Sequence, residues 1–363
     1  GESPLVLELS SWQLADLRAI EASRGQVFFR PVQACLSNIL KDHQNRYAHF
    51  YDYVADKFYI FEHIARSGGG ELLLESPPEN MFLGSHFWSD FAVRALHSQG
   101  PRSIRYFSSE MALPKEVKGL YWLPEGAYIR DGSGSEQLFL LRQSFPVLGR
   151  HSFRNYALAS YMAYRFLRKL DKCDLVSFSR RNQRLMTAFC GVPFRMELRG
   201  RLRFSESSTL SFINDTTATM PDATAEGVEA CMESGGFCLL IAGGTDKDLE
   251  PAKLLTILQH YQGRYAIFLL AGNGTQRLLR FFESSGLPYV GVFTSLSSAF
   301  QQAVRQAAAQ TAEYNQQYLL LSPGYASFGM FHNEFDRGRQ FNALVEDYLK
   351  LKNQAPLPEY ARR

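Results

Sequence analysis

Short apolar runs alternate with longer amphipathic stretches through the second half of the sequence, and this alternation restricts the fold more than any other feature. A run of about six apolar residues matches a buried strand, and the mixed stretch after it matches a helix that packs on a sheet. Strands that alternate with helices lie parallel in one sheet with helices on both faces. The sequence therefore predicts a doubly wound α/β domain with strands at 209–214, 237–242, 266–271, 289–293 and 318–322.

The first half predicts a further α/β domain with a mostly parallel sheet. Short aromatic runs broken by glycine and proline, over residues 100–146, favour an antiparallel edge. Gly191, Val192 and Pro193 suggest a boundary, which gives domains of 1–191 and 192–363. The expected strands of the first domain are 5–9 and 32–39, and its expected helices are 11–23, 49–66, 153–170 and 179–189.

Composition excludes several classes of protein. The length of 363 residues fits about two domains, and the formal charge of +3 is too small to favour nucleic acid as a partner. No apolar run approaches the roughly 18 residues of a membrane span. The 5 cysteines form no CxxC pair, so we expect a reducing, cytoplasmic compartment and no zinc site.

The segment 321–341 carries the sharpest functional signal. An apolar strand ends in Ser322-Pro323-Gly324, and the chain is expected to turn, expose Ser327 and Phe328, and enter a helix. Open α/β sheets bind ligands where a strand ends and a helix begins. The segment therefore predicts a ligand site at this edge of the sheet.

A glycine pair followed by a lysine comes after the expected strand 237–242. Gly243 and Gly244 allow close backbone approach, and Lys247 offers a fixed positive charge near a helix start. By itself this pattern is a generic anion-binding turn.

A third candidate set is Glu8, His43 and Lys57. A carboxylate and an imidazole at the ends of neighbouring parallel strands suit a divalent metal that also takes phosphate oxygens. Each residue alone is more often a helix cap, a turn residue or a solvated lysine.

Together these segments resemble the Mur ligase family, in particular its D-glutamate-adding ligases, over about 5–349. The matches follow the family order. Residues 6–14 (VLELSSWQL), 42–47 (DHQNRY) and 55–60 (ADKFYI) resemble the family's LELSSFQL, DHxDRY and AKxxIY; 149–155 (GRHSFRN), 193–195 (PFR), 214–219 (NDTTAT) and 321–328 (LSPGYASF) resemble its GxHNxxN, PHR, NDSKAT and carboxyl-terminal signature.

The resemblance implies a partial P-loop-type central domain followed by a Rossmann-like carboxyl-terminal domain. It implies an ATP-dependent amide ligase of peptidoglycan synthesis that adds D-glutamate to UDP-N-acetylmuramoyl-L-alanine through an acyl phosphate. The implied cofactors are ATP and two Mg²⁺ ions, and we expect a monomer that binds no nucleic acid.

The resemblance also assigns roles to individual residues. Glu8 and His43 would bind magnesium, with Lys57 carbamylated to place a second ion, and His43, Lys57 and Arg195 would be catalytic. The remaining assignments form two groups: His151, Asn155, Arg195 and Asp215 for ATP, and Thr219, Lys247, Ser327 and Phe328 for D-glutamate.

The sequence also departs from the family. No lysine directly follows a glycine in this sequence, so it contains no GxxxxGK[ST] phosphate loop, and we expect this chain to lack the family's N-terminal domain. Thr217, Ser152 and Asn45 replace a lysine, an asparagine and an aspartate. We therefore expect this chain to be inactive by itself. The alternatives are another Mur ligase, a folylpolyglutamate synthase relative, a non-catalytic nucleotide-binding paralogue and an unrelated two-domain binder.

Overall fold

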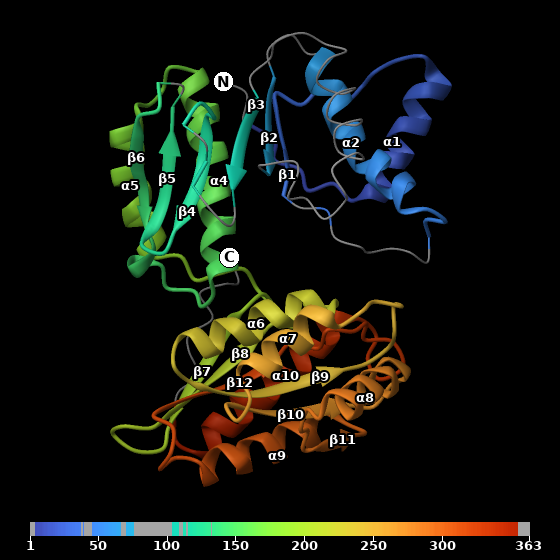
Figure 1. Ribbon diagram of the computed structural model, residues 1–363, viewed down its shortest axis with the longest axis vertical. Helices are drawn as coiled ribbons and strands as arrows, with labels where there is room; N and C mark the ends of the chain where they lie inside the picture. Colours follow the sequence, from blue (N-terminus) through green and yellow to red (C-terminus); the bar gives the residue numbers. More distant parts are fainter. Residues whose placement is uncertain are drawn as a thin grey trace. The chain divides into compact units, whose positions relative to one another are not determined.

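The chain divides into two compact units, which are described separately. A computed structural model describes residues 4–37, 39, 46–66, 70–75, 104–108, 112–113, 115–131 and 133–354. The first unit contains Gly1–Ser144 and Arg154–Leu185, and the second contains Phe145–Phe153 and Met186–Arg363. Each unit is an α/β structure, as the sequence predicts (Figure 1). Their assignment to ligase domains stays a prediction.

The first unit contains a sheet in the order β1-β2-β3-β4-β5-β6. Strands β1 to β4 pair parallel, and β4, β5 and β6 pair antiparallel. The predicted antiparallel edge is thus correct for its last three strands, while β3 is parallel to both neighbours. The strands are β1 (Gln33–Leu36), β2 (Glu71–Glu75), β3 (Ile104–Ser108), β4 (Gly119–Leu123), β5 (Gly126–Arg130) and β6 (Glu136–Leu141).

The helices of the first unit agree with the sequence pattern. α1 begins with a reciprocal capping box, in which Ser10 Oγ accepts from the Gln13 amide and Gln13 Oε1 accepts from the Ser10 amide. It ends at Gly25 in the left-handed conformation. The helices are α1 (Ser11–Arg24), α2 (Phe50–Arg66), α4 (Arg150–Lys169) and α5 (Leu175–Thr187); residues 150–153 of α4 belong to the second unit.

The strand predicted at residues 5–9 is wrong. This segment is extended chain without regular structure, and Leu5 and Val6 are 81% and 90% exposed. Alternating apolar residues form a strand only where a neighbouring strand and a core accept them. Among the described residues, the sheet begins at β1, and no strand pairs with this segment.

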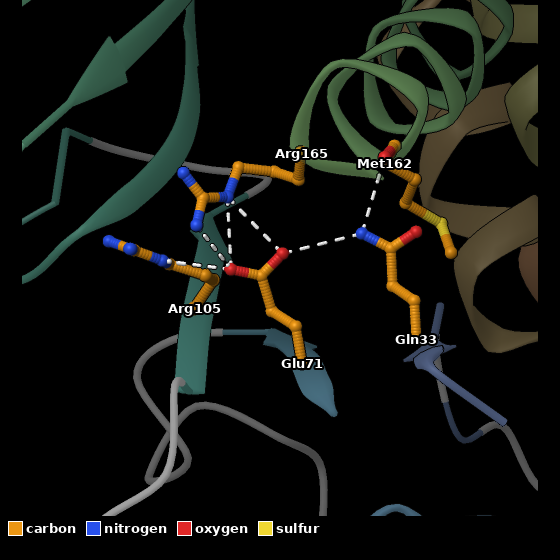
Figure 2. A network of polar contacts seen from close by, with 5 residues as sticks. All are labelled: Gln33, Glu71, Arg105, Met162 and Arg165. Carbon is orange, nitrogen blue, oxygen red and sulfur yellow. Dashed lines mark hydrogen bonds and ion pairs between the residues drawn. The ribbon is translucent and has the colours of Figure 1, made fainter. Parts of the chain in front are cut away.

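A buried carboxylate joins the amino-terminal ends of β1, β2 and β3 to α4. Glu71 Oε1 accepts from Arg105 Nε at 3.2 Å and from Arg165 Nη2 at 2.7 Å. Gln33 Nε2 bridges Glu71 Oε2 and the Met162 carbonyl (Figure 2). This network lies at the edge of the sheet opposite to the carboxyl ends of the parallel strands.

The second unit is a sheet in the order β11-β10-β9-β12-β8-β7. All pairs are parallel except that between β7 and β8. The five predicted strands are present, and the antiparallel edge strand β7 was missed. The strands are β7 (Glu197–Arg203), β8 (Thr209–Asn214), β9 (Phe237–Gly243), β10 (Tyr265–Leu270), β11 (Gly291–Phe293) and β12 (Gln316–Leu321).

Helices cover both faces of this sheet, and each face has its own apolar core. Side chains of α6, α7 and α8 pack with one face, and those of α9 and α10 pack with the other. The helices are α6 (Pro221–Glu233), α7 (Ala252–His260), α8 (Asn273–Ser285), α9 (Leu296–Ala309) and α10 (Glu334–Leu351). Of the helices that the structure describes, none is both long enough and apolar enough to cross a bilayer.

Candidate functional site

Three loops meet at one edge of the second unit's sheet. They follow β8, β9 and β12, which are adjacent and parallel in the order β9-β12-β8. The loops are residues 215–219, 243–248 and 322–328, and they carry the predicted D-glutamate ligands. We call Thr219, Lys247 and Ser327 the sheet-edge site.

Backbone hydrogen bonds join the three loops to one another. The Gly324 amide donates to the Ala218 carbonyl at 2.8 Å, and the Gly243 amide donates to the Pro323 carbonyl at 2.8 Å. Thr245 and Ala326 exchange both of their amide–carbonyl bonds, at 2.9 and 3.1 Å. The loops therefore form a connected platform.

The glycine pair is required by this close approach. Gly243 and Gly244 have φ of 106° and 141°, a region that side-chain-bearing residues rarely occupy. A Cβ on Gly244 would lie 2.4 Å from the Ala326 carbonyl oxygen, and one on Gly243 would lie 2.4 Å from Thr275 Oγ1. The close backbone approach inferred from the sequence is confirmed.

Lys247 and Thr219 come together at this edge. Lys247 Nζ donates to Thr219 Oγ1 at 3.2 Å, and both residues are half-buried. Thr219 lies just before α6, which begins with Pro221 at its first position. An ammonium, a hydroxyl and the amino-terminal end of a helix all favour an anionic group such as a carboxylate.

The structure places Ser327 and Phe328 differently from one another. Ser327 is buried at 4% exposure, so the expected exposure of Ser327 is wrong, whereas Phe328 is 67% exposed. The reason is the Thr245–Ala326 pairing, which draws the chain inward just before Ser327. Thr245 Oγ1 also donates to the Phe328 carbonyl.

A fully buried arginine ties two of these loops to α10. Arg337 Nε and Nη2 donate to Thr216 Oγ1 and the Thr216 carbonyl at 3.0 and 2.9 Å. Arg337 Nη1 donates to the Tyr325 carbonyl at 3.2 Å. All three acceptors are uncharged, and burial lowers the pKa of Arg337 to about 10.

Asp215 lies beneath the platform. Its Oδ1 accepts from the Met196 amide at 3.1 Å and its Oδ2 accepts from Ser322 Oγ at 2.8 Å. The residue is 7% exposed, and burial raises the pKa of its carboxyl to about 7. Both carboxylate oxygens thus face donors of the protein itself. The predicted contact of Asp215 with ribose stays a prediction.

Arg195 is the exposed last residue of a tight turn. The Arg195 amide donates to the Val192 carbonyl at 3.1 Å, which closes the turn. The residues on either side, Phe194 and Met196, have φ of 65° and 45°. A non-glycine residue with positive φ is uncommon, and two of them around one arginine mark a strained segment.

The other predicted nucleotide ligands lie on α4. His151 and Asn155 are one helical turn apart; His151 is half-buried and Asn155 is exposed. His151 Nδ1 lies 3.7 Å from Glu226 Oε2. Their role toward adenine stays a prediction.

The predicted metal ligands are not assembled by the described residues. Glu8 is exposed on the extended segment before α1, Lys57 lies on α2 with Nζ 5.2 Å from the centre of the Tyr53 ring, and His43 lies outside the described residues. In the described part of the chain, no three His, Cys, Asp or Glu side chains gather into a possible metal site. The magnesium role of these residues stays a prediction, and we assign no reaction step to a metal held by them.

Sequence reasoning missed the residues that connect the loops. Arg337 and Thr216 are 121 residues apart in the sequence, and no local pattern indicates that they meet. The strain at Phe194 and Met196 was also missed, because neither residue type suggests a left-handed conformation. Pro193, which often occupies the second position of a tight turn, was the one usable signal there.

No protein-family model matches the chain. It is 29% identical over 389 residues to a UDP-N-acetylmuramoylalanine--D-glutamate ligase of Treponema pallidum, covering 94% of this chain and 68% of the relative. The same-named proteins of Borreliella afzelii and Roseiflexus sp. are 29% and 30% identical, with 95% of this chain covered in both cases and 64% and 66% of the relatives. The chain thus spans about two thirds of the length of these relatives.

Solved structures also match. One is a UDP-N-acetylmuramoyl-L-alanyl-D-glutamate--2,6-diaminopimelate ligase, at 16% identity and a TM-score of 0.46, covering 94% of this chain and 64% of that one. Another is a folylpolyglutamate synthase of Thermotoga maritima, at 11% identity and a TM-score of 0.43, covering 88% and 63%. The sequence relatives carry the conclusion: the resemblance to D-glutamate ligases of the Mur family, first indicated by the motifs, is confirmed over nearly the whole length of this chain.

Proposed function

We propose that this chain is the nucleotide- and amino-acid-binding part of a cytoplasmic, ATP-dependent ligase of peptidoglycan synthesis. The ligase joins D-glutamate to UDP-N-acetylmuramoyl-L-alanine. The observation that carries the proposal is the Lys247–Thr219 contact of 3.2 Å on a platform of three connected loops. The similarity to named D-glutamate ligases supports the choice of substrate.

The sheet-edge site suits the amino-acid substrate. A dicarboxylic acid needs a fixed positive charge for one carboxylate and hydroxyl donors for the rest, which Lys247, Thr219 and Ser327 would supply. The loops are joined by backbone bonds, so these groups are held before the substrate arrives. A pre-positioned amine can attack without a further loss of orientational freedom.

The proposed reaction has two steps. The γ-phosphoryl group of ATP passes to the alanyl carboxylate, which forms an acyl phosphate and ADP. The D-glutamate amine then attacks the carbonyl carbon, the amide bond forms, and phosphate leaves with the former carboxylate oxygen. Arg195 would offset charge on the nucleotide phosphates, and His151 and Asn155 would contact the nucleoside. Magnesium would accompany ATP.

The test is phosphate release with Mg²⁺, ATP, UDP-N-acetylmuramoyl-L-alanine and D-glutamate. It is measured on this chain and on the full reading frame that encodes it. Activity that depends on D-glutamate, in the full reading frame, is the expected result. If neither protein releases phosphate, the ligase proposal is contradicted and a nucleotide-binding paralogue is favoured. Binding of Mg-ADP by the inactive protein would then identify such a paralogue. Activity with L-glutamate and a folate in place of D-glutamate would favour the folylpolyglutamate synthase alternative.

A matched pair of lysines tests the residue assignment. Lys247→Met removes the ammonium at the sheet-edge site, and Lys253→Met removes one from the neighbouring helix α7, where it pairs with Glu226. Loss of a charge-assisted bond of about 2 kcal/mol predicts a KM for D-glutamate about 30-fold higher for Lys247→Met. Lys253→Met should leave that KM within twofold. Equal effects of the two variants would refute the assignment.

A further inference from the structure

The turn that carries Arg195 is hydrogen-bonded to the loop that follows β8. We propose that Thr217 and Asp215 are positioning residues, which hold the strained turn 192–196 and thereby fix the direction of the Arg195 guanidinium. This inference deepens the proposed function, because it takes Arg195 as the residue that meets the nucleotide phosphates.

The turn is bonded to the loop on both sides of Arg195. On the amino-terminal side, Thr217 Oγ1 donates to the Phe194 carbonyl at 2.9 Å, and the Thr217 amide approaches the same oxygen at 3.4 Å. On the carboxyl-terminal side, the Met196 amide donates to Asp215 Oδ1 at 3.1 Å. The two bonds flank Arg195, which is itself exposed.

These bonds hold a segment whose backbone conformation is sterically unfavourable. Pro193 and Phe194 occupy the central positions of the closed turn, and Phe194 has φ of 65°. A positive φ at the second central position defines a type II turn, which glycine or asparagine normally occupies. Phenylalanine meets a steric penalty there, so the turn needs outside contacts to keep this shape.

The amide and the ring of Phe194 contact other residues, whereas the Phe194 carbonyl accepts from Thr217. The Phe194 amide donates to Glu197 Oε2 at 2.9 Å, and its ring lies 5.8 Å from the Phe335 ring. The ring is so close to α10 that a Cβ on Gly338 would lie 2.6 Å from Phe194 Cδ1. The carbonyl instead meets the β8 loop, where Thr217 supplies both the hydroxyl and the amide that approach it.

The arrangement assigns a positioning role to Thr217, which stands where the family motif has a lysine. A lysine at position 217 has no hydroxyl on its Cβ and cannot make the bond of Thr217 Oγ1 to Phe194. It also explains the burial of Asp215, whose oxygens are turned toward the Met196 amide and the Ser322 hydroxyl. Both side chains act on the nucleotide through Arg195.

The test is a double-mutant cycle between positions 194 and 217. Thr217→Val removes the hydroxyl and keeps the shape of the side chain, while Thr217→Ser keeps the hydroxyl. Phe194→Gly makes the turn Pro-Gly, which adopts a type II conformation without outside contacts. One readout is the exchange rate of the Arg195 amide hydrogen, and the other is Mg-ADP affinity of the whole chain.

In the natural background, Thr217→Val should speed exchange at Arg195 about tenfold, as loss of one net hydrogen bond predicts, and weaken Mg-ADP binding several-fold. Thr217→Ser should restore both to within about twofold. In the Phe194→Gly background, Thr217→Val should change neither by more than about twofold. A merely structural role of Thr217 would give the same loss in both backgrounds, and that result would overturn the proposal.

The two readouts separate this inference from the proposed function. If the natural chain binds no Mg-ADP, the nucleotide role of Arg195 fails, while the exchange data still decide whether Thr217 holds the turn. If Mg-ADP binds but Thr217→Val leaves exchange and affinity unchanged, the proposed function stands and the positioning role is refuted.

Discussion

Each unit of the protein buries a charged side chain, but the two charges are accommodated in opposite ways. In the first unit, Glu71 is 5% exposed and is bonded by two arginines, Arg105 and Arg165. In the second, Arg337 is 0% exposed and bonds to a hydroxyl and two peptide carbonyls. No carboxylate of the described residues pairs with Arg337.

This difference in hydrogen-bond partners indicates the structural role of each buried charge. In a buried ion pair, the attraction between opposite charges offsets the free-energy cost of removing them from water. Removing one partner therefore leaves the other charge buried and uncompensated. A guanidinium bonded to carbonyls has no such counterpart, but its fixed fork can hold separate backbone segments together. Glu71 therefore stabilises the junction of strands and helix, whereas Arg337 fixes the loops of the sheet-edge site.

The largest loss of stability caused by a substitution should come from breaking the Glu71 network. Glu71→Gln leaves two arginines in a confined space without their carboxylate, and we expect a loss of about 3 kcal/mol in the free energy of unfolding. Urea unfolding, followed with amide exchange of β1 to β3, measures the loss in this unit. Glu206→Gln, at an exposed loop position of the other unit, should change it by less than about 0.5 kcal/mol. A small effect of Glu71→Gln would show that the arginines find water instead.

A smaller loss should follow Arg337→Lys. Lysine keeps the positive charge but cannot reach all three acceptors in the geometry of the guanidinium, so we expect about 2 kcal/mol. Amide exchange should rise in the loops 215–219 and 322–328 before it rises in the strands. Arg339→Lys, exposed on the same helix, is the control and should be neutral. Loss spread evenly over the unit would contradict a loop-specific role.

The buried Asp215 should make stability depend on pH. Its folded pKa is about 7, and its unfolded value is about 4, so the folded state binds more protons between these values. Stability from this group is therefore greatest below pH ~4 and falls as pH rises toward 7, by at most about 1.4 kcal/mol per unit. Asp215→Asn can keep both hydrogen bonds and should remove this slope. We would compare unfolding midpoints of the two proteins from pH 4.5 to 8, and parallel curves would show that Asp215 is already ionised at low pH.

The smallest effect concerns a neutral contact in the first unit and sets the scale for the others. Ser10→Ala removes the acceptor of the α1 capping box, and we expect a cost of about 1 kcal/mol or less. Ser23→Ala, near the end of the same helix, removes a bond to the Ile20 carbonyl within a helix turn and should cost less. Thermal unfolding of both variants checks the order, and a reversed order would mean that the capping box is not formed in solution.

The fold was predictable where burial decides the structure. β9 and β10 are buried along their whole length, and such apolar runs can be recognised without any knowledge of their neighbours. β7 was missed although Glu197–Arg203 alternates charged residues with Leu198, Gly200 and Leu202; its central glycine and four charged residues weaken the strand signal. The strand predicted at residues 5–9 was wrong because the segment has a strand pattern but no described strand pairs with it.

The candidate site was predictable in place but not in detail. Lys247 was located by the glycine pair that follows a strand, and Thr219 by the resemblance to the ligase family. Their contact depends on the strand order, which puts β12 between β8 and β9. The roles of Arg337 and Thr217 could not be predicted, because each depends on a backbone carbonyl whose position only the folded chain defines.

The strand order has a consequence for synthesis on the ribosome. β12 is the last of the described strands to be made, yet it pairs with both β8 and β9 in the middle of the sheet. Until Leu321 has left the exit tunnel, β8 and β9 each keep an open edge, which invites pairing with other chains. This unit must therefore remain incomplete until nearly all of it is translated, and the nascent chain is an expected client of chaperones during that interval.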